Sequence, residues 1–259
     1  MDVTVDRDPD REHVGHLTIG FDELNLLSPD RIERIHAAVA DVPDEVVVLT
    51  IGPGEKALSA GLDLEWAVDR STEEGWAMLT GLYEMIQAVR DLEAVTVCGC
   101  GQAALGAGFE LALACDFRVA AADAALGLPE VRVGLPTVIQ GGLLVRHLGL
   151  ARAKRLIYLG ETINGTEAVD LGLVESAPGA DRQDAAVGDL VEELAAKSPT
   201  ALRWQSQAFR HWRSTGLEAG MERSIGDGAM CFGTPDQREA MRAFLDGREP
   251  AFGGGSEPK

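Results

Sequence analysis

The chain has 259 residues, of which 46% are hydrophobic and 25% charged, and its formal net charge at pH 7 is −19. This composition is ordinary for a folded globular protein and excludes wholesale disorder, and the negative charge argues against nucleic acid as a partner, because phosphates would be repelled. No apolar run approaches the roughly 18 residues that a membrane span needs, and residues 1–16 contain no signal-peptide-like segment, so we expect a cytoplasmic protein with no membrane partner.

The first half of the chain alternates between predicted helices and strands. Ser28 followed by Pro29 is typical of a helix start and predicts a helix that runs to about Val39. Residues 45–51 are apolar and rich in β-branched side chains, and a Gly-Pro-Gly turn follows them. This pattern predicts a buried strand that ends in a turn.

The next predicted elements continue the same alternation. Apolar residues at three- and four-residue steps predict a helix from Glu73 to about Val89. Two further apolar runs, 94–100 and 117–120, predict strands. Strands that alternate with helices imply an α/β core.

Beyond residue 181 the sequence changes from a mixed to a helical pattern. The predicted helices there cover residues 184–197, 200–213 and 236–245. We therefore place a boundary near residue 190, with a core over 1–190 and a helical C-terminal region over 191–259. Glycines and a proline near the end predict a flexible tail from residue 253.

Four cysteines occur in the chain, at positions 98, 100, 115 and 231. Cys98 and Cys100 lie in the predicted strand 94–100, and no histidine stands near them at the spacing of metal ligands. We therefore expect buried free thiols and no metal site.

Two segments with glycines each follow a predicted strand. Residues 58–63 follow the strand 45–51, and residues 105–110 follow the strand 94–100 and open a helix, whose free amides carry the positive end of the helix dipole. Two such turns after neighbouring strands can each aim one backbone N–H at a common point, which would form an oxyanion hole. The simpler alternative is that the glycines only permit tight connections.

Two glutamates stand in apolar surroundings close to these turns. Glu110 opens the helix after the second glycine segment, and Glu130 follows a Leu-Pro pair. Desolvation raises the pKa of such carboxyl groups into the range where they exchange protons near neutral pH. Taken singly, Glu110 can cap its own helix and Glu130 can pair with Arg132. Together, beside two amide-presenting turns, they favour acid/base chemistry.

These motifs, in this order, resemble the crotonase (enoyl-CoA hydratase/isomerase) superfamily over nearly the whole chain, and most of all its enoyl-CoA hydratases. The segments that carry the resemblance are Leu58–Asp63, Ala104–Asp116, Gly127–Val131, Leu159–Ile163, Ala168–Val174 and Phe244–Phe252. The resemblance implies a repeated ββα spiral core with a helical C-terminal trimerisation region. It also implies a homotrimer or a dimer of trimers.

The resemblance further implies an oxyanion hole built from the backbone N–H groups of Leu62 and Ala107, which would hold the thioester oxygen of an acyl-CoA substrate. Glu110 would act as base toward a water molecule, and Glu130 as acid toward the α-carbon. The residues expected to contact substrate or its CoA portion are Ala60, Gly61, Asp63, Gly106 and Lys56.

The implied activity is that of an enoyl-CoA hydratase, which adds water reversibly to a 2-enoyl-CoA and needs no cofactor, since CoA is part of the substrate. The alternatives are another crotonase-type acyl-CoA reaction, such as enoyl-CoA isomerisation, and a non-catalytic oligomeric scaffold.

The chain departs from the family pattern in four places. Ala107 replaces a glycine, and its Cβ restricts the backbone to negative φ. Residues 134–142 form a shorter version of the segment that shapes the acyl pocket. The segment Leu17–Asn25 lacks the basic residue that many relatives carry before their asparagine, and Gly247 stands where a lysine is common, so Lys56 becomes the candidate to meet the CoA phosphates.

Overall fold

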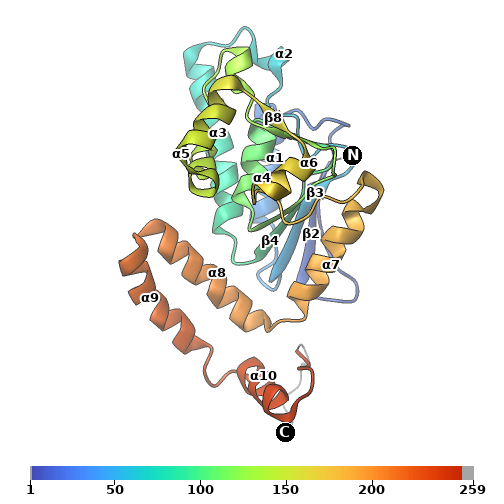
Figure 1. Ribbon diagram of the computed structural model, residues 1–259, viewed down its shortest axis with the longest axis vertical. Helices are drawn as coiled ribbons and strands as arrows, with labels where there is room; N and C mark the ends of the chain where they lie inside the picture. Colours follow the sequence, from blue (N-terminus) through green and yellow to red (C-terminus); the bar gives the residue numbers. More distant parts are fainter. Residues whose placement is uncertain (1, 253–259) are drawn as a thin grey trace.

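Two β-sheets form the centre of the protein, and the computed structural model describes residues 2–252 (Figure 1). The larger sheet has the strand order β1-β2-β3-β4-β6, and the smaller sheet has the order β5-β7-β8. The β1–β2 and β7–β8 pairs are antiparallel, whereas the other neighbouring pairs are parallel. The strands are β1 (Val3–Arg7), β2 (Val14–Ile19), β3 (Val48–Pro53), β4 (Val95–Gly99), β5 (Ala103–Leu105), β6 (Phe117–Val119), β7 (Ala125–Gly127) and β8 (Thr162–Ile163).

Helices connect the strands and then continue without strands toward the C-terminal end (Figure 1). The helices are α1 (Pro29–Ala40), α2 (Leu64–Ala67), α3 (Thr72–Asp91), α4 (Ala107–Ala114), α5 (Gly141–Leu159), α6 (Gly165–Asp170), α7 (Gln183–Ala195), α8 (Pro199–Ser214), α9 (Leu217–Met230) and α10 (Pro235–Asp246), with the 3₁₀ helices η1 (Glu130–Val133) and η2 (Ala180–Arg182). This architecture confirms the predicted α/β class.

The larger sheet is buried on both faces. In β3 the side chains of Leu49 and Ile51 belong to the main core, together with apolar side chains of α1 and α3. Val48 faces the opposite direction, because successive side chains of a strand alternate. It packs there with Val191 and Leu194 of α7. Burial on both faces explains why the sequence of β3 is a continuous apolar run.

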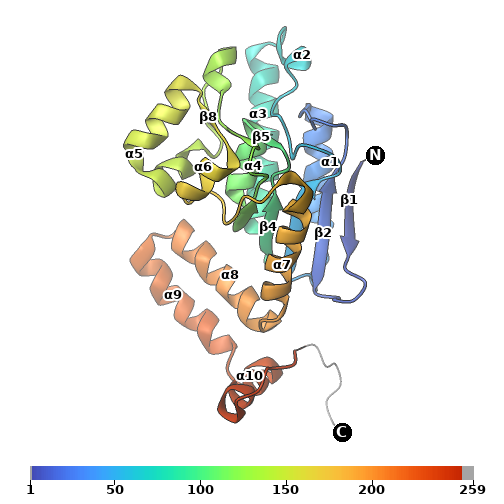
Figure 2. The same cartoon turned by 45° about the vertical axis from the view of Figure 1, so that its right-hand side comes forward.

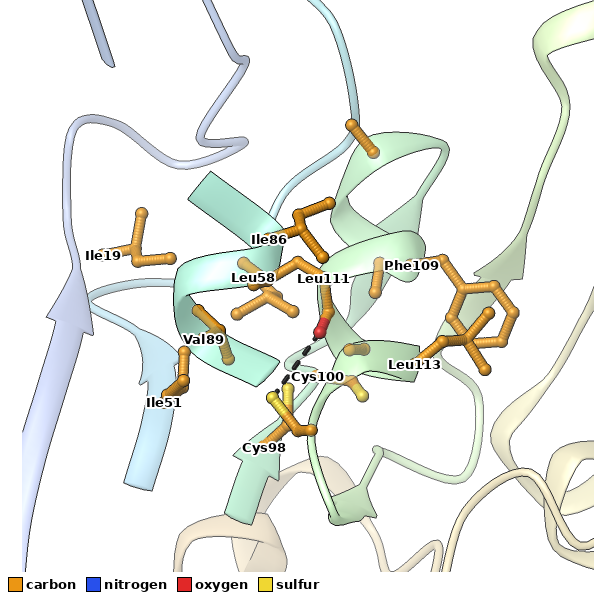
Figure 3. Close-up of a cluster of buried hydrophobic side chains, with 14 of the residues drawn as sticks. Ile19, Ile51, Leu58, Ile86, Val89, Cys98, Cys100, Phe109, Leu111 and Leu113 are labelled. Carbon is orange, nitrogen blue, oxygen red and sulfur yellow. Dashed lines mark hydrogen bonds between the residues drawn. The ribbon is translucent and has the colours of Figure 1, made fainter. Parts of the chain in front are cut away.

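Helix α4 runs through the main core and has no polar face. Every residue from Ala107 to Leu113 is buried. Figure 3 shows Phe109, Leu111 and Leu113 near side chains of α3 and of the larger sheet. Close packing therefore holds α4 in place.

The predicted elements of the first half are observed with small shifts. The helix expected after Ser28 is α1. The helix expected from Glu73 is α3, which begins at Thr72 because Ser71 and Glu74 form a capping box. The strands expected at 45–51, 94–100 and 117–120 are β3, β4 and β6.

The sequence patterns do not predict α5 or α9. Apolar side chains are spread around α5, which also kinks at Gly149, where φ is +73°. Helix α9 contains glycines in its interior, which are weak helix formers. Tertiary packing supports α9, which lies against α8 along much of its length.

Helices α8, α9 and α10, here called the C-terminal arm, extend away from the sheets (Figures 1 and 2). Hydrogen bonds join α8 to α9, from His211 Nδ1 to Asp227 Oδ2 at 2.8 Å and from Trp212 Nε1 to Ser224 Oγ at 3.1 Å. None of the helices between residues 2 and 252 combines the length and apolar character needed to cross a membrane.

The predicted boundary at residue 190 falls within α7, which packs on the larger sheet. The division into 1–190 and 191–259 stays a prediction. The predicted tail from residue 253 lies outside the described residues.

Candidate active site

The two glycine segments identified in the sequence lie side by side. Ser59 pairs with Ala104 in a parallel bridge, and the Leu105 N–H donates to the Ser59 carbonyl oxygen at 3.0 Å. Gly108 packs against the same residue so closely that a Cβ there would lie 2.2 Å from the Ser59 oxygen. Glycine at position 108 thus lets α4 approach the first segment.

The backbone N–H groups of Leu62 and Ala107 are both available to a ligand. Neither donates a hydrogen bond to any other residue between 2 and 252, and both residues line one cavity. Ala107 begins α4, so its N–H has no partner within the helix. The left-handed backbone is taken by the preceding Gly106, at φ +53°. Alanine in place of glycine at position 107 is therefore free of strain.

The cavity beside these amides has a volume of about 230 Å³. Apart from two glutamates and one arginine, its lining side chains carry no charge. The aliphatic side chains of its wall include those of Leu64, Leu79, Leu82, Leu135, Val138 and Ile139. Such a lining fits an uncharged, apolar chain.

Glu110 lies at the inner end of this cavity and is 3% exposed. Its Oε1 accepts hydrogen bonds from the backbone N–H groups of Gln140, at 2.6 Å, and Gly141, at 3.0 Å. Burial raises the pKa of Glu110 to about 7, the Glu130 charge adds to the rise, and the two amides oppose it. A carboxyl with this pKa can both take up and release a proton near neutral pH.

Glu130 opens η1 and lines the same cavity. Its Oε2 accepts a hydrogen bond from Thr137 Oγ1 at 2.7 Å. A Cβ placed on Gly106 would come within 3.5 Å of Glu130 Oε1, so the carboxylate lies over the turn that presents the Ala107 amide. The cavity therefore brings both glutamates next to the second glycine segment.

The other predicted contact residues divide into two groups. Ala60, Gly61 and Gly106 line the cavity. Asp63 does not; its Oδ1 caps α2 by accepting from the backbone N–H groups of Glu65 and Trp66. Lys56 is exposed outside the cavity and pairs with Glu23. The structure assigns capping and a surface ion pair to these two residues, and their contact with substrate stays a prediction.

Sequence reasoning missed Gln140, Gly141 and Thr137, whose backbone or side-chain groups hold the two carboxylates. The sequence signal for Gln140 and Gly141 is the apolar run that starts at the Gly141-Gly142 pair. This run forms α5, and the backbone N–H groups at the start of a helix have no partner within the helix, so they can bind Glu110. Arg132, predicted as a partner for Glu130, makes no ion pair with it in residues 2–252.

The described residues 2–252 contain no group of three or more His, Cys, Asp or Glu side chains arranged to hold a metal. Cys98, Cys100 and Cys115 are buried free thiols, and the neighbouring thiols of Cys100 and Cys115 raise the pKa of Cys98. Cys231 is half-buried. The prediction of buried free thiols is thus confirmed for the three residues of the core.

Two carboxyl groups and two main-chain donors with no partner among residues 2–252 meet on an apolar cavity, which makes this cavity a candidate acid/base site in a two-sheet α/β protein. The chain belongs to the enoyl-CoA hydratase/isomerase family, whose model matches residues 13–255.

Curated relatives and solved structures agree with this membership. The chain is 31% identical to a crotonyl-CoA hydratase of Syntrophomonas wolfei, over 88% of this chain and 90% of that protein. It is 33% identical to a probable enoyl-CoA hydratase of Bacillus subtilis, over 94% and 96% of the two chains. The crystal structure of an enoyl-CoA hydratase from Bacillus anthracis superposes with a TM-score of 0.89, at 28% identity, over 97% of this chain and 99% of that one.

The crotonase fold and family membership predicted from the sequence are therefore confirmed. The chain is an enzyme of this family rather than a non-catalytic scaffold.

Proposed function

We propose that the protein is an enoyl-CoA hydratase that adds water reversibly to a 2-enoyl-CoA. The observation that carries this proposal is the meeting of Glu110 and Glu130 in one apolar cavity with the unpaired N–H groups of Leu62 and Ala107. The names of the relatives from Syntrophomonas wolfei and Bacillus subtilis agree with it.

In this mechanism the thioester oxygen of the substrate accepts hydrogen bonds from the Leu62 and Ala107 amides. Negative charge develops on that oxygen when a nucleophile adds to the β-carbon, and each donor contributes about 3–4 kcal/mol to its stabilisation in comparable sites. Both donors are held by rigid packing, so little reorganisation is needed as the charge forms.

Glu110, in its ionised form, removes a proton from water while the water oxygen forms its bond to the β-carbon. The C=C electron pair moves toward the thioester oxygen and gives an enolate. Protonated Glu130 then delivers its proton to the α-carbon, and the thioester carbonyl reforms. Glu110 then releases its proton to solvent, and Glu130 takes up a proton from solvent. Both groups are back in their starting states, so the net reaction is the addition of one water.

Hydration needs two proton-transferring groups at the reacting water, and both are present. Isomerisation is the alternative reaction, and one relative, from Mycosarcoma maydis, is named an enoyl-CoA isomerase/hydratase. Moving a double bond needs only one group that carries a proton between two carbons. Two carboxyls with separate hydrogen-bond partners favour hydration.

The substrate class follows from the cavity. Its volume of about 230 Å³ exceeds the ~150 Å³ that accommodates a benzene molecule. Its wall is aliphatic, so an unbranched acyl chain of small or medium length fits. The CoA portion is part of the substrate, and no further cofactor enters the proposed reaction.

The proposal includes assembly into a trimer or a dimer of trimers and a cytoplasmic location. Support for assembly comes from the C-terminal arm, which exposes large apolar side chains: Leu217, Ile225, Phe232, Phe244 and Leu245 are each at least 65% exposed. Burying such side chains against a second copy removes apolar surface from water. Sedimentation equilibrium gives the mass of the assembly, and a monomer at micromolar concentration would contradict this part.

The test is the loss of the conjugated thioester absorbance of crotonyl-CoA on addition of enzyme. Glu110→Gln and Glu130→Gln are each expected to lower kcat about 10²–10⁴-fold, the usual contribution of a general acid or base. Glu192→Gln, which changes an exposed glutamate of α7, is the control. Unchanged rates in both site variants contradict the mechanism. Conversion of a 3-enoyl-CoA, without hydration of crotonyl-CoA, identifies an isomerase instead.

A further inference from the structure

Gln140 connects the Glu110 carboxylate to the opposite side of the core. Its backbone N–H donates to Glu110 Oε1 at 2.6 Å, and its side-chain Oε1 accepts from Arg90 Nη1 at 3.1 Å. The residue is 4% exposed. Its Nε2 has no hydrogen-bond partner among residues 2–252. The bond to Arg90 is therefore the one interaction that orients this buried amide within the described chain.

Arg90 is in turn fixed by the C-terminal arm. It stands in the last turn of α3, and its carbonyl oxygen accepts from Arg213 Nη1 of α8 at 3.2 Å. Arg213 Nη2 also pairs with Asp91 Oδ1 at 2.7 Å. Burial lowers the pKa of Arg90, the charges of Arg213 and Arg146 lower it further, and the charge of Asp91 opposes them.

We propose that Arg90 and Gln140 are positioning residues for Glu110, and that α8 supports them by holding the end of α3 through Arg213. The proposal rests on the role of Glu110 as base in the proposed function.

The need for such an anchor follows from the segment that precedes Gln140. Most residues between 131 and 138 are exposed, so packing does little to fix the peptide that leads into α5. Gln140 is the N-cap of α5 and has a non-helical backbone, with φ −122° and ψ +5°. The direction of its N–H group is therefore set by local contacts rather than by the hydrogen-bond pattern of the helix. Tying its side chain to α3 holds that N–H on the carboxylate.

The charge state of Glu110 reports on this contact. A backbone N–H that donates to a carboxylate favours the ionised form, and each such bond lowers the pKa by about 1. The charged group that faces Glu110 across the cavity is Glu130 of η1, which acts in the opposite direction. Loosening Gln140 weakens the first effect and leaves the second in place.

The experiment is a ¹³C NMR titration of side-chain-labelled glutamate in the full-length protein without substrate, with the Glu110 signal assigned by Glu110→Gln. Arg90→Ala and Gln140→Met are each expected to raise the pKa of Glu110 by about 1. In the enoyl-CoA assay the acidic limb of kcat/KM then moves to higher pH by the same amount. Arg155→Ala removes an exposed ion pair with Glu161 and is the matched control.

Two further variants separate positioning from general damage. Arg90→Lys keeps a cationic donor and is expected to titrate like the parent. Arg213→Ala is expected to move the pKa of Glu110 in the same direction as Arg90→Ala, but by less. Arg210→Ala, which removes another contact of α8 with Asp91 and Glu93, leaves the Arg213 contact with Arg90 in place and is expected to have no effect.

A Glu110 titration in Arg90→Ala or Gln140→Met that matches the parent overturns the proposal, as does an Arg90→Lys variant that shifts as far as Arg90→Ala. A parent-like titration in Arg213→Ala overturns the part assigned to α8. Because the titration needs no substrate, it is independent of the proposed function. A parent protein that shows the expected shifts but does not hydrate enoyl-CoA contradicts only that function.

Discussion

The two walls of the cavity are built in different ways. The wall that carries Leu62, Ala107 and Glu110 consists of buried and half-buried segments in close contact with one another, since even a methyl group on Gly108 would overlap the Ser59 oxygen. The opposite wall, residues 131–139, is largely exposed. In the proposed function, the amide donors and the base thus belong to the closely packed part of the molecule, and the surface that would face the acyl chain belongs to the exposed part.

This difference separates chemistry from substrate choice. Electrostatic stabilisation of a transition state requires donors that do not reorganise, which close packing provides. A specificity wall can change without cost to the core, because substitutions at exposed positions seldom alter stability by more than about 0.5 kcal/mol. We expect substitutions in the first wall to affect folding and rate together, and those in the second to affect mainly the choice of acyl chain.

The largest effect is expected from Gly108→Ala. The new Cβ would lie 2.2 Å from the Ser59 carbonyl oxygen, a backbone atom that cannot move aside, so α4 must shift. Overpacking of this kind destabilises by about 1–3 kcal/mol or more, and displacement of the Ala107 amide is expected to lower kcat at least 10²-fold.

The matched control is Gly142→Ala in α5, where an added Cβ has no neighbour within 4 Å. Its helix position favours alanine over glycine by up to about 1 kcal/mol. Urea denaturation and the crotonyl-CoA assay measure both variants. Equal stabilities would show that the first wall is not as rigid as its packing indicates.

The next effect concerns the pH dependence of stability. Burial raises the pKa of Glu110 from 4.5 to about 7 in the folded protein. The folded state therefore binds its proton more tightly than the unfolded state, and this group loses its stabilising contribution as the pH rises from about 4.5 through 7. At 1.36 kcal/mol for each pH unit, the loss is about 3 kcal/mol.

Glu110→Gln has no charge to bury and does not suffer this loss. Its free energy of unfolding is expected to increase, relative to that of the parent, by about 3 kcal/mol between pH 4 and pH 8, so the variant becomes the more stable of the two as the pH rises. Denaturant titrations of both proteins across that range test the sign, and taking the difference cancels the other titrating groups. A difference that stays constant with pH would mean that Glu110 is not desolvated.

The first wall was largely predictable from the sequence, whereas the second was not. Strand β3 has an apolar run, and the glycines and Glu110 mark the turn into α4, so local patterns identify these elements. The contact of Gln140 with Glu110 joins residues 30 positions apart in the chain. No local pattern encodes that contact, because only the fold brings Gln140 next to Glu110 of α4.

Asp63 and Lys56 are the two predicted contact residues that do not line the cavity. Both lie next to the oxyanion segment in sequence, and proximity in sequence suggested contact with substrate. The backbone turns at Gly61, where φ is +97°, and Asp63 then caps α2 while Lys56 meets Glu23 outside the cavity. Residues next to a site in the sequence therefore need not line the cavity, because the backbone can turn away from it.

A smaller effect is expected from Thr137→Val. The hydroxyl of Thr137 donates to Glu130 Oε2 at 2.7 Å, and valine keeps the shape of the side chain without the donor. Loss of a hydrogen bond to a charged group costs about 1.5–3 kcal/mol if the carboxylate stays unsolvated. Glu130 is only half-buried, so water replaces part of the interaction. We expect kcat to fall roughly 5- to 10-fold with stability nearly unchanged, and Thr137→Ser to restore it.

The smallest effect on the enzyme as a whole, and the sharpest test of the comparison, is expected from Val138→Ala. Val138 lines the cavity and is 57% exposed, so its truncation removes pocket surface and little core. The free energy of unfolding is expected to change by less than about 0.5 kcal/mol. The ratio of kcat/KM for octenoyl-CoA to that for crotonyl-CoA should rise about 3- to 10-fold, because two missing methyl groups in an apolar pocket change discrimination by about 1 kcal/mol or more.

Leu82→Ala, on the same cavity but 1% exposed, is the contrasting variant: it is expected to lose about 2–5 kcal/mol of stability. If both variants changed chain-length preference and stability alike, the two walls would not differ in kind, and the substrate would be selected by the core itself.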